Sequence, residues 1–144
     1  MILADEAATA AAGARLARHL RPGDAILLSG DLGAGKTTLV RGLLHELGHE
    51  GEVPSPTFAI VQPYEEVDPP VWHADLYRIE SAGELDELGL DSLAHAALVV
   101  EWPERAGADA CPDALRLSLA ITGATERRLT AEVPAAWEGR WPTQ

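Results

Sequence analysis

The segment from Gly30 to Thr37 reads Gly-Asp-Leu-Gly-Ala-Gly-Lys-Thr, and it constrains the fold more than any other part of the chain. It matches the pattern G-x-x-x-x-G-K-[ST], a phosphate-binding loop whose glycines let backbone N–H groups converge on phosphate oxygens. In this pattern the lysine reaches the β- and γ-phosphates, and the Ser or Thr hydroxyl binds Mg²⁺. Lys36 is the only lysine in the chain, so it does not belong to a population of surface lysines.

The residues on either side of the loop predict the arrangement that phosphate binding needs. Residues 25–28 form a short apolar run typical of a buried strand, and residues 37–47 carry apolar side chains at helical spacing. A strand, a glycine loop and a helix in this order point the helix N-terminus at the phosphates. We therefore expect the nucleotide to contact a consecutive set of residues: Asp31, Leu32, Gly33, Ala34, Gly35, Lys36, Thr37 and Thr38.

The composition limits the partners and the location that fit this chain. An apolar fraction of 47% supports a hydrophobic core, and the formal net charge of −12 repels nucleic-acid phosphates. Any nucleic acid should therefore be reached only through a partner protein. No stretch approaches the ~20 apolar residues of a membrane helix, residues 1–15 lack the basic region of a signal peptide, and the single cysteine, Cys111, excludes an internal disulfide. These features predict a cytoplasmic protein without membrane contact.

The type of nucleotide is indicated by residues that the chain lacks. It contains no asparagine, and its one lysine lies in the phosphate loop. The guanine-specific motifs Asn-Lys-x-Asp and Thr-Lys-x-Asp therefore do not occur in this sequence. This absence favours ATP over GTP.

The rest of the chain predicts a single α/β domain with a mixed, mostly parallel central sheet flanked by helices. No internal repeat or linker divides residues 1–136, and residues 137–144 are expected to form a loose C-terminal tail. A capping-box pattern from Ser81 to Glu84 predicts the start of a helix. The other expected elements are a helix over residues 5–20 and strands over residues 57–64, 71–75, 96–101, 115–121 and 128–133.

Two acidic residues follow apolar runs and are candidates for the chemistry of a bound nucleotide. Glu101 ends the run 97–101, and Asp75 ends the run 71–75. Ligands of open α/β sheets gather at the carboxyl ends of the strands, although a carboxylate there can also face water or cap a helix. Thr57 follows two prolines in a stiff connector, where it could sense a γ-phosphate or form an ordinary turn.

A rival motif, H-E-x-x-H, occurs from His45 to His49. Zinc binding by this motif needs both histidines on one continuous helix. Gly48 comes directly before the second histidine, where the helix is expected to end, and no third ligand stands at a recognisable spacing. His19, His73 and His95 form no ligand cluster by spacing, so we expect structural or surface roles for them.

Taken in series, the motifs resemble the TsaE (YjeE) family of bacterial ATPases in tRNA threonylcarbamoyladenosine biosynthesis. Order and spacing fit from about residue 5 to about residue 133, which is nearly the whole chain. The phosphate loop is shared with many families, whereas the segments that follow it are more specific. The segments that carry the resemblance are Gly30–Thr38, Gly48–Val53, Ser55–Phe58, His73–Arg78, Glu84–Leu85, Gly89 and Glu101–Pro103.

This resemblance implies a P-loop NTPase fold that binds ATP and Mg²⁺ and has weak ATPase activity alone. It also implies a partner, the TsaD–TsaB complex, that installs threonylcarbamoyl on adenosine 37 of tRNA. The roles that it implies by position are Mg²⁺ binding by Thr37 and Glu101, orientation of the attacking water by Asp75, a switch-loop role for Thr57, and contact with the nucleotide by Trp102.

The resemblance is shorter on the side of the nucleotide base. Glu6, with Asp5 and Thr9, matches the N-terminal segment of the family near the base, and either Arg127 or Arg128 is expected to line the same side. The chain departs from the family pattern in two places. The residue before Asp75 is alanine rather than a bulky residue, and the serine at position 55 follows a proline rather than a basic residue. Neither departure touches the expected chemistry.

The sequence thus supports the hypothesis of a Mg²⁺-dependent ATP hydrolase in which Asp75, Lys36 and Thr57 act in catalysis. Two alternatives stay open. A small-molecule kinase would need a second, often arginine-lined pocket and a lid, and the ten arginines are scattered along the chain. A nucleotide-gated binding module would need ATP occupancy alone, with hydrolysis incidental.

Overall fold

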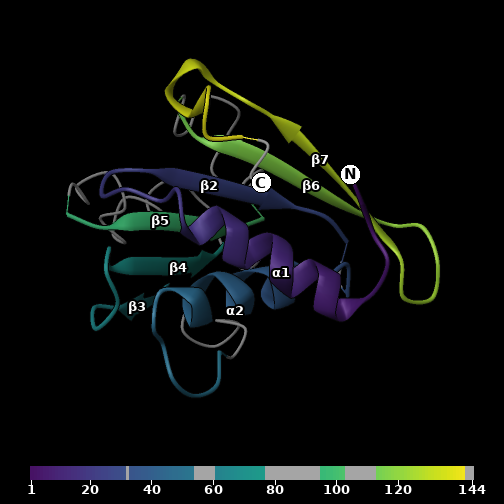
Figure 1. Ribbon diagram of the computed structural model, residues 1–144, viewed down its shortest axis with the longest axis horizontal. Coiled ribbons are helices and arrows are strands. Elements are labelled where there is room, and N and C mark those ends of the chain that lie inside the picture. The colour runs from purple at the N-terminus through teal and green to yellow at the C-terminus, as the bar shows by residue number, and fades with distance from the viewer. Residues whose placement is uncertain (32, 54–60, 77–94, 103–112, 142–144) are drawn as a thin grey trace.

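A seven-stranded sheet runs through the described part of the chain, and four adjacent strands within it are parallel (Figure 1). The computed structural model describes residues 1–31, 33–53, 61–76, 95–102 and 113–141. The spatial order of the strands is β1-β7-β6-β2-β5-β4-β3, with β1, β7 and β3 antiparallel to their neighbours. The strands are β1 (Ile2–Leu3), β2 (Ala25–Ser29), β3 (Val61–Tyr64), β4 (Val71–Asp75), β5 (Ala97–Glu101), β6 (Leu115–Ile121) and β7 (Arg127–Glu132).

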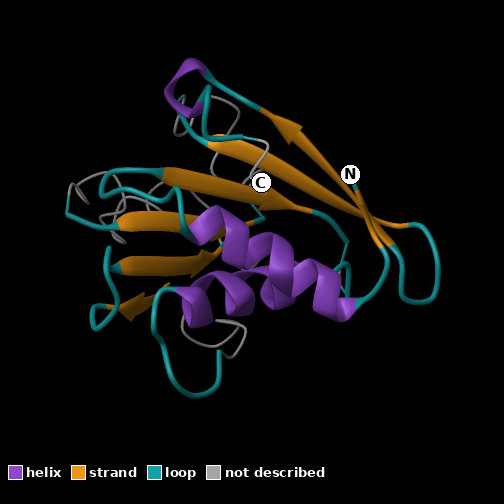
Figure 2. Ribbon diagram, viewed as in Figure 1, coloured by secondary structure: helices purple, strands orange, loops and turns teal. Residues whose placement is uncertain are grey.

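Two helices, α1 (Glu6–Ala17) and α2 (Lys36–Glu46), lie side by side on one face of this sheet (Figure 2). Asp5 caps α1 by accepting a hydrogen bond of 2.8 Å from the backbone N–H of Ala8. The expected mixed, mostly parallel α/β fold is confirmed. The core between helices and sheet is made of aliphatic side chains that are fully buried, among them Leu16, Leu28, Leu39, Leu43, Val99 and Leu117.

The two helices touch at a pair of glycines. A Cβ atom at Gly13 would stand 2.9 Å from the backbone nitrogen of Leu43, and one at Gly42 would stand 2.6 Å from the carbonyl carbon of Ala10. Both distances are shorter than real Cβ contacts. Glycine is therefore required at this crossing, because the backbones approach more closely than any side chain allows.

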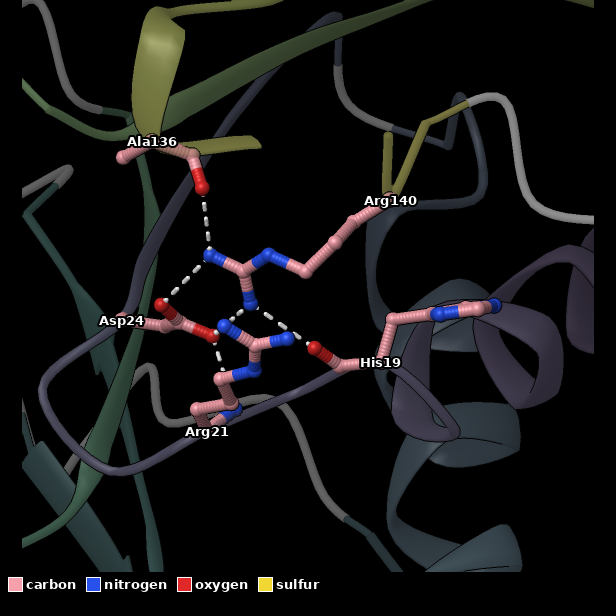
Figure 3. Close-up of polar contacts among 5 residues, drawn as sticks. All are labelled: His19, Arg21, Asp24, Ala136 and Arg140. Atoms are coloured by element: carbon pink, nitrogen blue, oxygen red, sulfur yellow. Dashed lines mark hydrogen bonds and ion pairs between the residues drawn. The ribbon is translucent and has the colours of Figure 1, made fainter. Parts of the chain in front are cut away.

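The expected loose C-terminal tail is wrong for the described residues 137–141. Trp137 is fully buried at the end of a short 3₁₀ helix, Ala135–Trp137. The Arg140 guanidinium lies 4.0 Å from the centroid of the Trp137 ring. It also donates to both carboxylate oxygens of Asp24, at 2.7 and 3.0 Å, and to the carbonyl oxygens of His19 and Ala136, both at 2.8 Å (Figure 3).

We call this set the C-terminal clasp: Trp137, Arg140, Asp24 and the carbonyls of His19 and Ala136. It ties the end of the chain to the turn that precedes β2. The sequence signal was an aromatic residue and an arginine three positions apart. The acidic partner lies 116 residues earlier in the chain, so local spacing could not reveal it.

The other expected elements agree with the structure to different degrees. The strands at 71–75 and 115–121 have the predicted bounds, and the helix expected over residues 5–20 is shorter at both ends. The short strand β1 was not expected. The first part of the strand predicted over 57–64 and the helix predicted from Ser81 lie outside the described residues. Within the described ranges, no helix has the length and apolar character to cross a membrane.

Candidate functional site

The phosphate loop joins the end of β2 to the start of α2, as the sequence predicted. Gly35 precedes the helix with φ of 104°, a left-handed conformation that favours glycine. Lys36 begins α2, and its side chain is almost fully buried. Its Nζ atom donates a hydrogen bond of 2.6 Å to the carbonyl oxygen of Gly30. The lysine side chain therefore links the end of the loop to its first residue. Leu32, within the loop, lies outside the described residues.

The two candidate acids meet at the edge of the sheet beside this loop. Strand β5 pairs with both β2 and β4, and Glu101 is in register with Leu28 on one side and Asp75 on the other. Glu101 is 3% exposed and Asp75 is 5% exposed. The structure thus brings two carboxylates from neighbouring strands next to the end of β2, where the phosphate loop begins.

Trp102 follows Glu101 and lies against the phosphate-loop lysine. The centroid of its ring is 3.7 Å from Nζ of Lys36, a cation–π contact. Its φ of 60° is in the left-handed region, which is rare for a bulky residue and is typical of functional sites. The backbone N–H of Trp102 donates to the carbonyl oxygen of Leu28, so the strained residue is fixed to the end of β2.

A cavity of about 300 Å³ opens beside the loop. It joins three parts of the chain: the start of α1, the phosphate loop with α2, and the turn between β6 and β7. The structure thus places Glu6 and Thr9 beside the loop. The cavity is lined by Glu6, Thr9, Gly33, Gly35, Thr38, Ala124, Thr125 and Arg127.

Of the two candidate arginines, Arg127 is the one that lines this cavity. Its guanidinium donates to the carbonyl oxygens of Gly123 at 3.0 Å and Glu126 at 2.9 Å within the turn. It also donates to the carbonyl oxygen of Gly33 at 3.3 Å, which ties the turn to the phosphate loop. Both arginines belong to β7 and pair with β1, but Arg128 is exposed and does not line the cavity.

Sequence reasoning missed three residues at or near the site. Ala124 and Thr125 reach the cavity from the turn between β6 and β7, and nothing in their local sequence points to a nucleotide. His73, expected in a structural or surface role, is fully buried with Nε2 2.6 Å from Oε2 of Glu101. The signal for His73 was its position two residues before Asp75, which places both side chains on one face of β4.

The remaining expected site residues are placed as follows. Asp31 is exposed and accepts a hydrogen bond of 3.0 Å at its carbonyl oxygen from the N–H of Ala34, within the loop. Thr37 is half-buried in the first turn of α2. Thr57 lies outside the described residues. Glu6 is exposed and pairs with Arg41 of α2 at 3.3 Å.

The residues present fit a magnesium ion by their chemistry. The Thr37 hydroxyl and the carboxylates of Glu101 and Asp75 are hard oxygen ligands, which Mg²⁺ prefers. Mg²⁺ is commonly held by one or two carboxylates together with substrate phosphates and water, rather than by a cage of protein groups. Among the described residues, no cluster of three or more His, Cys, Asp or Glu side chains suited to a metal occurs.

The H-E-x-x-H segment lacks the geometry of a zinc site. Helix α2 ends at Glu46, and Gly48 turns the chain with φ of 107°. His49 instead contacts Oε1 of Glu66 through Nδ1 at 2.7 Å, and this hydrogen bond raises the pKa of His49 above its usual value. A backbone hydrogen bond within Glu66, followed by the contact with His49, lowers the pKa of Glu66. This pair joins the end of α2 to the turn between β3 and β4.

Comparison with known proteins gives one consistent result. The family model described as threonylcarbamoyl adenosine biosynthesis protein TsaE matches residues 3–129. A protein of Streptomyces coelicolor named tRNA threonylcarbamoyladenosine biosynthesis protein TsaE is 42% identical, over 84% of this chain and 94% of that protein. Its namesake in Bacillus subtilis is 38% identical, over 79% of this chain and 72% of that protein.

A solved structure agrees with these sequences. The crystal structure of YdiB from Bacillus subtilis superposes with a TM-score of 0.82 at 29% identity. The match covers 97% of this chain and 88% of that one. The likeness therefore extends over nearly the whole chain.

Proposed function

The chain belongs to the TsaE family of threonylcarbamoyl adenosine biosynthesis proteins, and we propose that it binds ATP with Mg²⁺ and hydrolyses it to support tRNA modification. The observation that carries this proposal is the edge of the sheet where the loop of Lys36 meets two buried carboxylates, Asp75 and Glu101. A phosphate loop alone holds a nucleotide, whereas hydrolysis also needs metal ligands and a group that orients water. Acids beside the loop supply both.

The phosphates of ATP would be held mainly by the loop backbone and the N-terminus of α2. Lys36 would exchange its hydrogen bond to Gly30 for one to a phosphate oxygen, with its ammonium group still against the Trp102 ring. Thr37 and Glu101 would hold Mg²⁺, and Asp75 would orient the attacking water. When bound, Mg²⁺ would neutralise negative charge that develops on the phosphates.

The nucleoside would occupy the cavity between α1, the loop and the turn of Arg127. A volume of about 300 Å³ is at the lower end of the range for small-molecule pockets. The absence of a guanine-specific loop favours adenine in this cavity. Arg127 would contribute by holding the turn against Gly33.

ATP turnover would serve a TsaD–TsaB-type complex that transfers threonylcarbamoyl to adenosine 37 of tRNA. The charge of this chain supports an indirect role, because a net charge of −12 disfavours direct binding to an RNA backbone. The partner complex would therefore hold the tRNA, and this chain would supply the nucleotide-dependent step in the cytoplasm.

The first test is on the isolated site, by calorimetry with ATP and Mg²⁺ and by phosphate release. Lys36→Ala should abolish tight ATP binding or turnover, and unchanged hydrolysis would reject the site. Asp75→Ala should keep ATP affinity within a few-fold and lower turnover by about 100-fold or more. Arg127→Ala should weaken ATP binding, and its neighbour Arg128→Ala is the matched control because Arg128 lies outside the cavity.

The second test is reconstitution of threonylcarbamoyl transfer with a TsaD–TsaB complex, with and without this chain and ATP. No dependence on the chain would contradict the proposed role. A non-hydrolysable ATP analogue that supports only one round would favour hydrolysis as the resetting step, and full turnover would favour a nucleotide-gated module. Phosphate transfer to a metabolite panel, in place of phosphate release, would indicate a kinase.

A further inference from the structure

We propose that His73 is a positioning residue that fixes the carboxylate of Glu101 for metal binding; this inference rests on the proposed function. His73 lies on β4 in register with Val99 of β5, and its side chain is fully buried. Its Nε2 atom is 2.6 Å from Oε2 of Glu101, whose side chain is 4% exposed. His73 and Glu101 are therefore in close contact at the edge of the sheet, and both side chains are shielded from water.

The hydrogen-bonding pattern assigns the histidine proton. Nδ1 of His73 is buried and has no hydrogen-bond partner among the described residues. A proton on Nδ1 would bury an unpaired donor, whereas the neutral ring with its proton on Nε2 leaves only an unpaired acceptor. We therefore assign the Nε2–H tautomer, with Nε2–H donating to Oε2 of Glu101.

This hydrogen bond limits how Glu101 can bind a cation. With Oε2 held by His73, metal binding by Glu101 would use Oε1. The His73 ring is enclosed in the core and therefore fixed in place. Its hydrogen bond also restricts rotation of the Glu101 carboxylate about the Cγ–Cδ bond. Removal of a group that hydrogen-bonds to a metal ligand in this way typically lowers metal affinity by about 10- to 100-fold.

The position of His73 in the core makes a purely structural role the alternative. A buried polar pair contributes little stability relative to apolar side chains of the same volume, so stability alone gives no reason for a histidine here. The two roles differ in one measurable quantity. A structural residue affects the free energy of unfolding, whereas a positioning residue affects the dependence of ATP affinity on Mg²⁺.

The test compares four variants of the full chain by calorimetry with ATP, in EDTA and in Mg²⁺, beside urea unfolding. His73→Leu should leave metal-free ATP affinity within about twofold and reduce the enhancement by Mg²⁺ about 10- to 100-fold. His73→Gln should restore most of the enhancement, because its amide nitrogen can reach the position of Nε2. His73→Asn should not, because its amide is shorter. Val99→Ala, a core substitution on the neighbouring strand, should lower stability and leave the enhancement unchanged.

Several results would overturn the inference. It fails if His73→Leu keeps the full Mg²⁺ enhancement, if Asn restores it as well as Gln, or if Val99→Ala reduces it equally. It also fails if long-range ¹H–¹⁵N spectra of the free protein place the proton of His73 on Nδ1. A wild-type chain that binds ATP no better with Mg²⁺ than without would overturn the proposed function as well, and the two failures are thereby distinguishable.

Discussion

The substitution Gly42→Ala sets two physical effects of opposite sign against each other. Alanine has a higher helix propensity than glycine, by about 1 kcal/mol, so propensity alone predicts a more stable protein. Gly42, however, lies where α2 crosses α1. A Cβ atom there would stand 2.6 Å from the carbonyl carbon and 2.8 Å from the Cα of Ala10, and closer still to its carbonyl oxygen.

The steric effect should win. Carbon atoms in ordinary contact are ~3.5 Å apart, so the two helices would have to separate by about 1 Å. The obstructing atoms are helix backbone, which cannot rotate aside as a side chain can. Overpacking of this kind costs about 3 kcal/mol at the upper end of its usual range, and subtracting the gain in propensity leaves a net destabilisation of about 2 kcal/mol.

Urea unfolding followed by circular dichroism measures this difference directly. Ala11→Gly is the matched control, because Ala11 is an exposed residue of α1 and its substitution changes propensity alone. It should cost about 1 kcal/mol. Because α2 begins at Lys36, a displaced helix should also weaken ATP binding. A Gly42→Ala protein as stable as the wild type, or more stable, would refute the reasoning that the two backbones are in contact.

Further predictions concern the C-terminal clasp and the contact between His49 and Glu66. Trp137→Ala should destabilise the protein by roughly 3–5 kcal/mol in urea unfolding, because the ring is fully buried; a cost below 1 kcal/mol would indicate a loose tail. Arg140→Met should cost about 3 kcal/mol, because the Asp24 carboxylate would lose its cationic partner while keeping the hydrogen bond from the Arg21 N–H, and additivity with Asp24→Asn would show that the two side chains are not coupled. The pKa of His49, measured by NMR titration, should lie above 6.5 and fall in Glu66→Gln. Because the folded-state pKa of His49 is raised, its contact with Glu66 stabilises the fold below pH 6.5, and this stabilisation is lost as the pH rises through the folded-state pKa of His49. The pKa of Glu66 is lowered, so the same stabilisation is also lost as the pH falls through the folded-state pKa of Glu66.

Local pattern predicted a large part of the fold. The strands 71–75 and 115–121 were predicted with the bounds that the structure has, because alternation and apolar runs depend on neighbouring residues. The end of α2 shortly before Gly48 followed from glycine chemistry, and it places His45 and His49 on different sides of the helix end rather than on one continuous helix.

The C-terminal clasp and β1 were missed for a common reason. The Arg140 guanidinium finds its acid across 116 residues, and Ile2 of β1 pairs with Arg128 near the other end of the chain. A two-residue strand has no period of its own. Neither contact leaves a pattern that a window of neighbouring residues could contain.

The sequence by itself determined the pieces of the site: a glycine loop with one lysine, and two acids at the ends of apolar runs. Their chemistry depends on side-chain type and local spacing, and both are given directly by the order of residues in the chain. Only the tertiary structure decided that Glu101 lies in register with Asp75, that Arg127 rather than Arg128 faces the cavity, and that His73 touches Glu101. These relations depend on strand order and on which faces become buried, and burial is a property of the whole chain.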